Sequence, residues 1–171
     1  VEEAIACIQR PHTKSVQIIF NMLRLKPAEE FFNLAKDKGV AIIVRVPLAS
    51  GLLTGKMNSN STFPENDHRN YNINGDAFDV GETFSGVDFN TALKVVDELK
   101  SITPEGFSLS QLALKWILMH DAVSVIIPGA KSSDQALSNI SASSLPDISN
   151  LMKQIENIYA TYLKDDIHPR W

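Results

Sequence analysis

The feature that most constrains the fold is a set of three short apolar runs, each followed by a helical pattern. The runs are Lys14 to Phe20, Val40 to Leu48 and Val123 to Ile127, and the second is almost entirely apolar. A strand of that composition is expected where both faces of a sheet are covered. Strands that alternate with helices indicate parallel pairing through right-handed crossovers. The sequence therefore predicts an α/β fold with parallel strands.

The number of strands limits which α/β fold is possible. Three parallel strands are too few to close a barrel of eight, so we expect part of a larger barrel. The chain begins at Val1 within a helical pattern and without an initiator Met, which also leads us to expect a fragment. Between strands two and three, residues 49–88 form a long polar stretch rich in Gly and Asn. A structureless loop of that length is uncommon in a compact domain and is usually functional or disordered.

Composition and charge exclude several classes of protein. The net charge of -4 and the pI near 5.5 disfavour nucleic acid as a partner. No apolar run reaches the roughly 18 residues that a membrane span needs. The single cysteine, Cys7, excludes an internal disulfide, and its place on a helix stripe predicts a small core residue. We expect a reducing, cytoplasmic setting.

Metal sites have little support in the sequence. The four histidines are far apart and form no i, i+4 pair. Residues 70–75 partly mimic a calcium loop, but Gly81 occupies the twelfth position and Glu82 falls one residue late. No metal site is predicted.

The first candidate binding loop is PLASGLLTGK at positions 47–56, which leaves the second strand. Gly51 and Gly55 would let backbone N–H groups approach an anion, and Lys56 would add positive charge. The segment is not a Walker-type loop, because three residues rather than four separate its glycines and Met57 replaces the Ser or Thr. A turn that uses glycine only for its backbone angles explains the same residues.

The second candidate loop is IPGAKSS at positions 127–133, which leaves the third strand and begins a helix. Helix N-termini bind phosphate through free N–H groups and the helix dipole. Lys131 stands just before the expected cap Ser132, and Gln135 completes a capping-box signature. An ordinary capped helix with an exposed lysine is the alternative. Two such loops after consecutive parallel strands favour binding, because they match the phosphate site of barrel enzymes.

Several segments resemble the aldo-keto reductase family. Val16 to Arg24 is similar to the family's V-Q-x-x-y-N-l-l-r strand, and Gly39 to Lys56 is similar to its g-v-x-x-x-a-y-s-P-L-a-s-G-l-L-t-G-k signature. Gln111 to Trp116 and Ile127 to Asn139 resemble its a-l-x-W and I-P-G-a-x-s-x-x-Q-x-x-x-N segments. Phe63 to Phe84 resembles a bacterial oxidoreductase branch. The resemblance covers nearly the whole chain.

The resemblance implies a (β/α)8 TIM barrel that binds NADPH in extended form at the C-terminal ends of its strands. Residues 1–171 would be the C-terminal part of that single domain. Gln17 would bond the nicotinamide carboxamide. The pyrophosphate would be lined by Pro47, Leu48, Ser50, Gly51, Leu52 and Lys56. The adenosine and its 2′-phosphate would be held by Gly129, Ala130, Lys131, Ser132, Gln135 and Asn139.

Lys131 and Arg45 bear on how the cofactor would be held. Lys131 favours NADPH over NADH, because a charge-assisted contact to the 2′-phosphate contributes about 1.5–3 kcal/mol. Arg45 stands where the family has an aromatic residue under the nicotinamide, and Val46 stands where it has Ser. Arginine also stacks on planar rings, so Arg45 is a predicted cofactor contact. A cation there would interact differently with the oxidised and reduced rings.

No catalytic residue is assigned. The family's catalytic Asp, Tyr, Lys and His lie on earlier strands, and no residue here matches them. Tyr71 stands in the long loop, whereas Tyr159 and Tyr162 stand on the last helix. The parent protein is therefore expected to reduce small aldehydes or ketones with NADPH, and the isolated chain is expected to be inactive.

An alternative is a non-catalytic nucleotide-binding or interaction module. Exposed strand edges and apolar faces invite association, so this module would need a cover. Self-association or the missing N-terminal half would provide it. Neither nucleic acid nor a membrane is an expected partner.

Overall fold

The computed structural model describes residues 1–171 and contains a parallel sheet with the strand order β1-β2-β3. β1 spans Ser15–Ile19, β2 spans Ala41–Arg45 and β3 spans Val123–Ile126. The register between β2 and β3 shifts at one point, which leaves Ser124 without a strand partner. The predicted α/β class and parallel pairing are confirmed. A closed (β/α)8 barrel needs eight parallel strands. The three strands of this chain therefore form only part of such a barrel.

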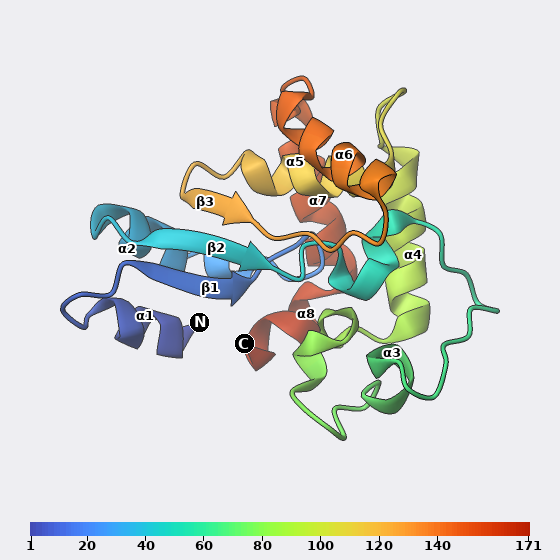
Figure 1. Ribbon diagram of the computed structural model, residues 1–171, viewed down its shortest axis with the longest axis horizontal. Coiled ribbons are helices and arrows are strands. Elements are labelled where there is room, and N and C mark those ends of the chain that lie inside the picture. The colour runs from blue at the N-terminus through green and yellow to red at the C-terminus, as the bar shows by residue number, and fades with distance from the viewer.

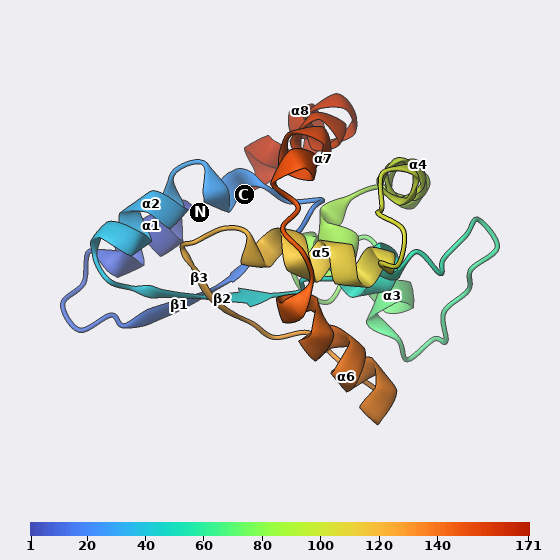
Figure 2. The same cartoon turned by 90° about the horizontal axis from the view of Figure 1, so that it is seen from above.

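Helices pack around this sheet and form most of the remaining structure. The α-helices are α1 Glu2–Ile8, α2 Phe31–Asp37, α3 His68–Tyr71, α4 Phe89–Ser101, α5 Leu109–Leu118, α6 Ser133–Ser141, α7 Ser149–Tyr162 and α8 Lys164–Ile167. The 3₁₀ turns are η1 Lys26–Ala28, η2 Ala49–Thr54, η3 Val80–Glu82, η4 Phe84–Gly86, η5 Ala142–Ser144 and η6 His168–Arg170. Figure 2 shows the sheet edge-on, with α2, α5 and α7 on one side and α6 on the other. None of the helices is long and apolar enough to cross a membrane.

Only one face of the sheet is covered within this chain. Ile42 and Val44 on β2 are fully buried, whereas Val125 is 43% exposed and Ile127 is 46% exposed on or next to β3. Val125 pairs with Ile43, which points away from Ile42 and Val44 because side chains alternate along a strand. The prediction that both faces of the second strand are covered is therefore wrong for this chain. Its apolar composition includes a face that this chain covers only in part.

The covered face contacts an aromatic core. Phe20, just after β1, stacks on Trp116 of α5 with ring centroids 4.9 Å apart and contacts Phe32 of α2 edge-on at 4.7 Å. The three rings are large apolar groups, and their burial stabilises the packing of the helices on the sheet. Cys7 lies outside this core. It is exposed because α1 buries only Ile8, so the prediction that Cys7 is a core residue is wrong.

The long segment after β2 is irregular but not structureless. It contains η2, the short helix α3, and the turns η3 and η4. Asn72 organises its middle: this fully buried side chain accepts the N–H groups of Ala77 and Phe78, each at 2.9 Å, and donates to Thr83 Oγ1 at 3.1 Å. A buried polar side chain with all of these partners fixes the path of the backbone around it. The segment that connects β2 to α4 in Figure 1 is therefore an ordered loop with short helical turns.

Candidate functional site

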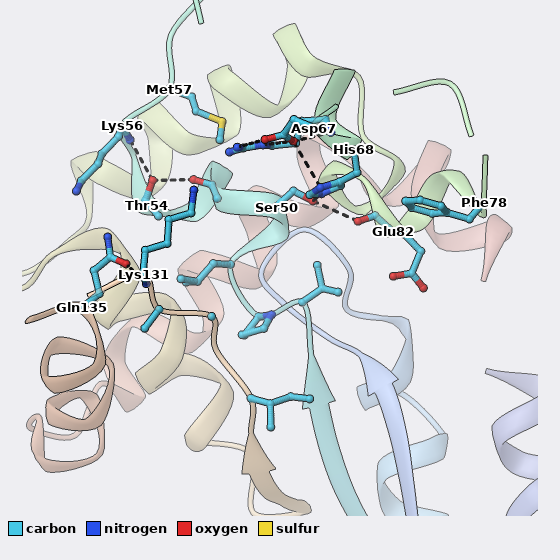
Figure 3. A pocket seen from close by; sticks show the side chains of 18 residues that line it. Ser50, Thr54, Lys56, Met57, Asp67, His68, Phe78, Glu82, Lys131 and Gln135 are labelled. Carbon is cyan, nitrogen blue, oxygen red and sulfur yellow. Dashed lines mark hydrogen bonds and ion pairs between the residues drawn. The ribbon is translucent and has the colours of Figure 1, made fainter. Parts of the chain in front are cut away.

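A cavity of about 970 Å³ opens where β2 and β3 end. The carboxyl ends of parallel strands meet at one edge of a sheet, which is the usual place for ligands in α/β folds. Its volume is within the range of small-molecule and cofactor sites. The cavity is lined by Val46, Pro47, Leu48, Ser50, Gly51, Thr54, Lys56, Met57, Asp67, His68, Arg69, Phe78, Glu82, Ile127, Gly129, Ala130, Lys131 and Gln135. Figure 3 shows these side chains around the opening.

The first wall of the cavity has an unusual backbone. Val46, Ala49 and Ser50 have φ values of 51°, 48° and 56°, and Gly51 has a φ of 95°. Positive φ is uncommon for residues other than glycine and is rarest for β-branched ones. At Gly51 a Cβ would also lie 3.1 Å from Met57 Cε, so the Met57 side chain would have to shift slightly. Turns of this kind can form concavities that suit anions. Here the Gly51 N–H donates to the Leu48 carbonyl at 2.9 Å and the Ala49 N–H to the Val46 carbonyl at 3.1 Å, so neither N–H is free for a ligand.

Ser50 connects this wall to the segment that covers it. Its hydroxyl donates to the carbonyl of Glu82 at 3.2 Å and accepts the N–H of Phe84 at 3.1 Å. The ring of His68 approaches the same hydroxyl, with Nε2 3.4 Å from Oγ. One side chain thus joins η2, α3 and η3–η4. The strained turn is held in place by these contacts, as such conformations require.

The second wall is the loop after β3. Ser132 caps α6 by accepting the N–H of Gln135 at 3.3 Å, as the cap signature predicts. The Gln135 side chain accepts from Lys131 N at 2.6 Å. Asn139 Nδ2 donates to the carbonyl of Gly129 at 3.2 Å. Polar side chains from both ends of α6 therefore shape the loop that presents Lys131. Figure 3 shows the Lys131 side chain directed toward the segment that carries Thr54.

The charges around the cavity leave two cations unpaired. Arg69 donates two hydrogen bonds to the Asp67 carboxylate, from Nε to Oδ1 at 2.9 Å and from Nη2 to Oδ2 at 2.6 Å. This pairing holds the pKa of Asp67 well below its usual range and raises the pKa of Arg69. Lys56 and Lys131 form no ion pair, which leaves them available for a negatively charged ligand. No cluster of three His, Cys, Asp or Glu side chains is suited to a metal ion.

Arg45 lies at the end of β2 but does not line the cavity. Its guanidinium makes two parallel hydrogen bonds to the Glu82 carboxylate, at 2.5 and 2.6 Å. These bonds raise the pKa of Arg45. Bidentate pairing fixes the plane of the guanidinium and neutralises its charge. Arg45 thus anchors η3 to the sheet.

The structure brings most of the predicted site residues together. The cavity is lined by Pro47, Leu48, Ser50, Gly51, Lys56, Gly129, Ala130, Lys131 and Gln135. The remaining predicted contacts do not line it: Gln17, Arg45, Leu52, Ser132 and Asn139. Gln17 is exposed on β1, and the Leu52 side chain is fully buried beneath the turn. The role of all these residues in binding a cofactor stays a prediction.

Several lining residues were not predicted, foremost Asp67, His68, Arg69, Phe78 and Glu82. Asp is a residue type that often caps helices, and Asp67 does cap α3 by accepting the backbone N–H of Arg69 at 3.0 Å. That local signal says nothing about where α3 lies. Tertiary contacts such as those of Ser50 with His68 and Glu82 bring the segment over the cavity, and no periodicity in the sequence encodes them.

Comparison with known proteins places these features in a family. The model of the Aldo/keto reductase family matches residues 3–160. Aldo-keto reductase YhdN of Bacillus subtilis (strain 168) is 29% identical over 161 residues, which are 92% of this chain and 45% of that protein. A probable voltage-gated potassium channel subunit beta of Arabidopsis thaliana is 33% identical over 129 residues, 72% of this chain and 36% of that protein.

Solved structures show the same relation. The glycerol dehydrogenase AKR11B4 from Gluconobacter oxydans has a TM-score of 0.70 at 24% identity and covers 92% of this chain and 45% of its own. The holo form of aldo-keto reductase AKR11C1 from Bacillus halodurans has a TM-score of 0.62 at 25% identity, with 90% and 45% covered. The chain thus spans less than half the length of these relatives.

Proposed function

Because the chain belongs to the aldo/keto reductase family, we propose that its cavity binds NADPH and that it is the cofactor-binding portion of a reductase for aldehydes or ketones. The observation that supports this proposal is the convergence of two loops on one cavity. Lys56 from the first loop and Lys131 from the second reach it without an ion-pair partner. A dinucleotide with an additional phosphate provides anionic groups for both.

The residues present fit such a cofactor. The turn around Ser50 and Gly51 would lie against the pyrophosphate, since both residues line the cavity, and Lys56 would supply the charge that holds it. Lys131, at the start of α6, would hold the 2′-phosphate, where the helix dipole adds to its charge. Bound NADPH supplies the hydride for carbonyl reduction. The chain's own contribution is to bind and orient it.

We further propose that this chain alone does not catalyse reduction. The family's proton donor is a tyrosine, and no tyrosine lines the cavity. Tyr71, on α3, is 45% exposed and packs against Phe78 without lining the cavity itself. The chain aligns with less than half of each similar reductase, and the expected catalytic residues belong to strands outside that part. Residues 1–171 would then be the C-terminal part of one barrel domain.

A pair of titrations tests the binding proposal. NADPH and NADH are added separately to the chain, and cofactor fluorescence is followed. We expect NADPH to bind at least about tenfold more tightly, because Lys131 contacts only the phosphorylated cofactor. Equal affinity for both would contradict the assignment of Lys131, and binding of neither would contradict the proposed site.

A separate assay tests inactivity. NADPH oxidation is followed with small aldehydes and ketones, and we expect no turnover above that of cofactor and carbonyl alone. Robust turnover would overturn this part of the proposal. The binding titration distinguishes an inactive chain that holds NADPH from one that does not.

A second candidate function, an interaction module, is favoured by exposed apolar residues. Leu137 and Ile140 on α6 are 65% and 68% exposed, and they lie on the helix that follows the uncovered β3. Apolar groups gathered in this way commonly mark contact surfaces. Light scattering tests this candidate: self-association would support it, whereas a well-behaved monomer that melts cooperatively would count against it.

A further inference from the structure

We propose that Trp171 is a positioning residue for the cofactor cavity: it holds the segment 79–87, whose backbone in turn holds Ser50. This inference rests on the proposed function and deepens it, since it concerns the wall of the same cavity. Trp171 does not line that cavity. Its ring instead packs against Gly81 of η3 and Gly86 of η4.

Two glycines make room for the Trp171 ring. A Cβ on Gly86 would lie 2.4 Å from Trp171 Cη2, and a Cβ on Gly81 would lie 2.7 Å from Trp171 Cζ2. Neither distance is possible for a real side chain. Another residue at Gly86 would displace the ring, and one at Gly81 would displace the ring and the Arg24 Nη1 atom, which would lie 2.6 Å from its Cβ. Gly81 has an ordinary negative φ, so close approach rather than backbone conformation requires glycine there. The segment is therefore shaped around the indole.

Polar groups fix the ring in this place. The Trp171 indole N–H donates to Asp79 Oδ1 at 3.3 Å, and Asp79 also caps η3 by accepting the N–H of Gly81 at 2.7 Å. The Arg24 guanidinium lies 4.1 Å from the centre of the ring. Arg24 is only 9% exposed, and two of its nitrogens, Nε and Nη1, have no hydrogen-bond partner.

The contact between Arg24 and the Trp171 ring is important because Arg24 is buried. Burial lowers the pKa of Arg24 to about 10, which shows how poorly this environment solvates the cation. Attraction between a cation and an aromatic face is strongest where water is excluded. Trp171 therefore stabilises Arg24 together with the nearby carboxylates of Asp79 and Glu82, and Arg24 in turn holds the ring against the glycines.

The inner side of the same segment holds the cavity wall. Phe84 N–H and the Glu82 carbonyl both bond the Ser50 hydroxyl. Asn21 Nδ2 bridges the Ser85 hydroxyl and the Val46 carbonyl, each at 2.9 Å. The segment thus lies between Trp171 on one side and the strand ends on the other.

The backbone of this segment would not keep its shape unaided. Phe84 and Ser85 have φ values of 52° and 58°, in the left-handed region that residues other than glycine rarely adopt. Such conformations persist only where the surrounding contacts impose them. Removing Trp171 would remove the outer contact, so the segment would relax and Ser50 would lose its fixed partners.

Amide hydrogen exchange and NADPH titration together test the proposal. In Trp171→Ala we expect exchange of the amides in residues 79–87 to rise by about tenfold, because opening of the segment no longer breaks the indole contacts. We expect the Kd for NADPH to rise about threefold to tenfold, because a wall residue loses its orientation. Trp171→Phe keeps a ring beside Arg24 but has no N–H for Asp79. Its exchange rates and its Kd for NADPH should lie between those of the unmodified chain and those of Trp171→Ala.

Tyr162→Ala is the matched control. Tyr162 is also a partly exposed aromatic residue near the end of the chain, but it bonds Glu98 rather than the segment. It should change neither readout. Unchanged exchange in Trp171→Ala would overturn the proposal, and so would faster exchange with an unchanged Kd. If the unmodified chain does not bind NADPH, the proposed function fails, and exchange alone still decides whether Trp171 holds the segment.

Discussion

The two loops that meet at the cavity are built in different ways. The loop after β2 rests on fully buried side chains, Ala49, Leu52 and Leu53, and is tied to the covering segment through Ser50. The loop after β3 leads into α6, which has no buried residue at all. One wall is therefore part of the core, whereas the other is held by a helix cap and a few exposed hydrogen bonds.

Because of this difference, we expect the two walls to contribute unequally to the stability of the fold and to the binding of a ligand. The wall after β2 contributes shape that is present before any ligand arrives. The wall after β3 contributes Lys131, an exposed charge whose position depends on the local contacts of Gln135 and Asn139. Substitutions of the buried residues beneath the first wall should mainly affect folding, and substitutions of exposed residues in the second should mainly affect ligand binding.

The same substitution in both walls gives the largest expected contrast. Leu52→Ala should lower the free energy of unfolding by about 2–5 kcal/mol, because it leaves a cavity in the core. Leu137→Ala on α6 should change it by less than about 0.5 kcal/mol, because the side chain is mostly exposed. Urea denaturation of both variants measures the two values. Equal losses would erase the distinction between the walls.

Removing the charge of the second wall should weaken binding without affecting the fold. For Lys131→Met we expect the Kd for NADPH to rise roughly tenfold to hundredfold, since a charge-assisted hydrogen bond is lost. The Kd for NADH and the unfolding free energy should stay the same. Lys153→Met, on α7 away from the cavity, is the control. A loss of NADH affinity as large as that of NADPH would argue that Lys131 does not recognise the additional phosphate.

Two helix caps sharpen the contrast further. Ser132 caps the exposed α6, and Ser108 caps α5, whose apolar face is buried in the core. Ser108→Ala should reduce the global unfolding free energy by about 1 kcal/mol. Ser132→Ala should instead speed hydrogen exchange in the first turn of α6 while changing global stability little, because α6 can fray without opening the core. A global loss from both would mean that α6 unfolds together with the rest of the chain.

The smallest expected effect concerns the covering segment and depends on pH. The pKa of Asp67 is depressed by Arg69, so this pair adds stability above the unfolded value of 3.8 and loses it as the pH falls below that value toward the folded pKa. Asp67→Asn keeps a good helix cap but removes the charge. We expect a loss of about 0.5–1 kcal/mol at neutral pH that disappears in acid. Chemical denaturation of both proteins across this range tests it; a difference independent of pH would contradict the assignment.

The sequence predicted the local parts of this structure well. Strand positions and the cap at Ser132 follow from apolar runs and from side-chain chemistry within a few residues, and both were confirmed. Gly51 was also flagged as a backbone-determined position, and it has a positive φ. These features depend on interactions close in the chain, which the sequence shows directly.

Contacts between distant segments could not be predicted. The bidentate pair of Arg45 with Glu82 and the approach of His68 to Ser50 depend on how the long segment folds back. The burial of Leu52 and the exposure of Cys7 depend on which helix face meets the core. In each case the residue type is compatible with several environments, and only packing selects one.

Hydrogen exchange with and without saturating NADPH tests most directly whether the two walls form one site. We predict that the amides of residues 47–56 and of residues 129–135 become protected together, while those of α1 stay unchanged, because a single extended ligand bridges both loops. Protection of one loop alone, or of neither, would contradict a shared dinucleotide site at the ends of β2 and β3.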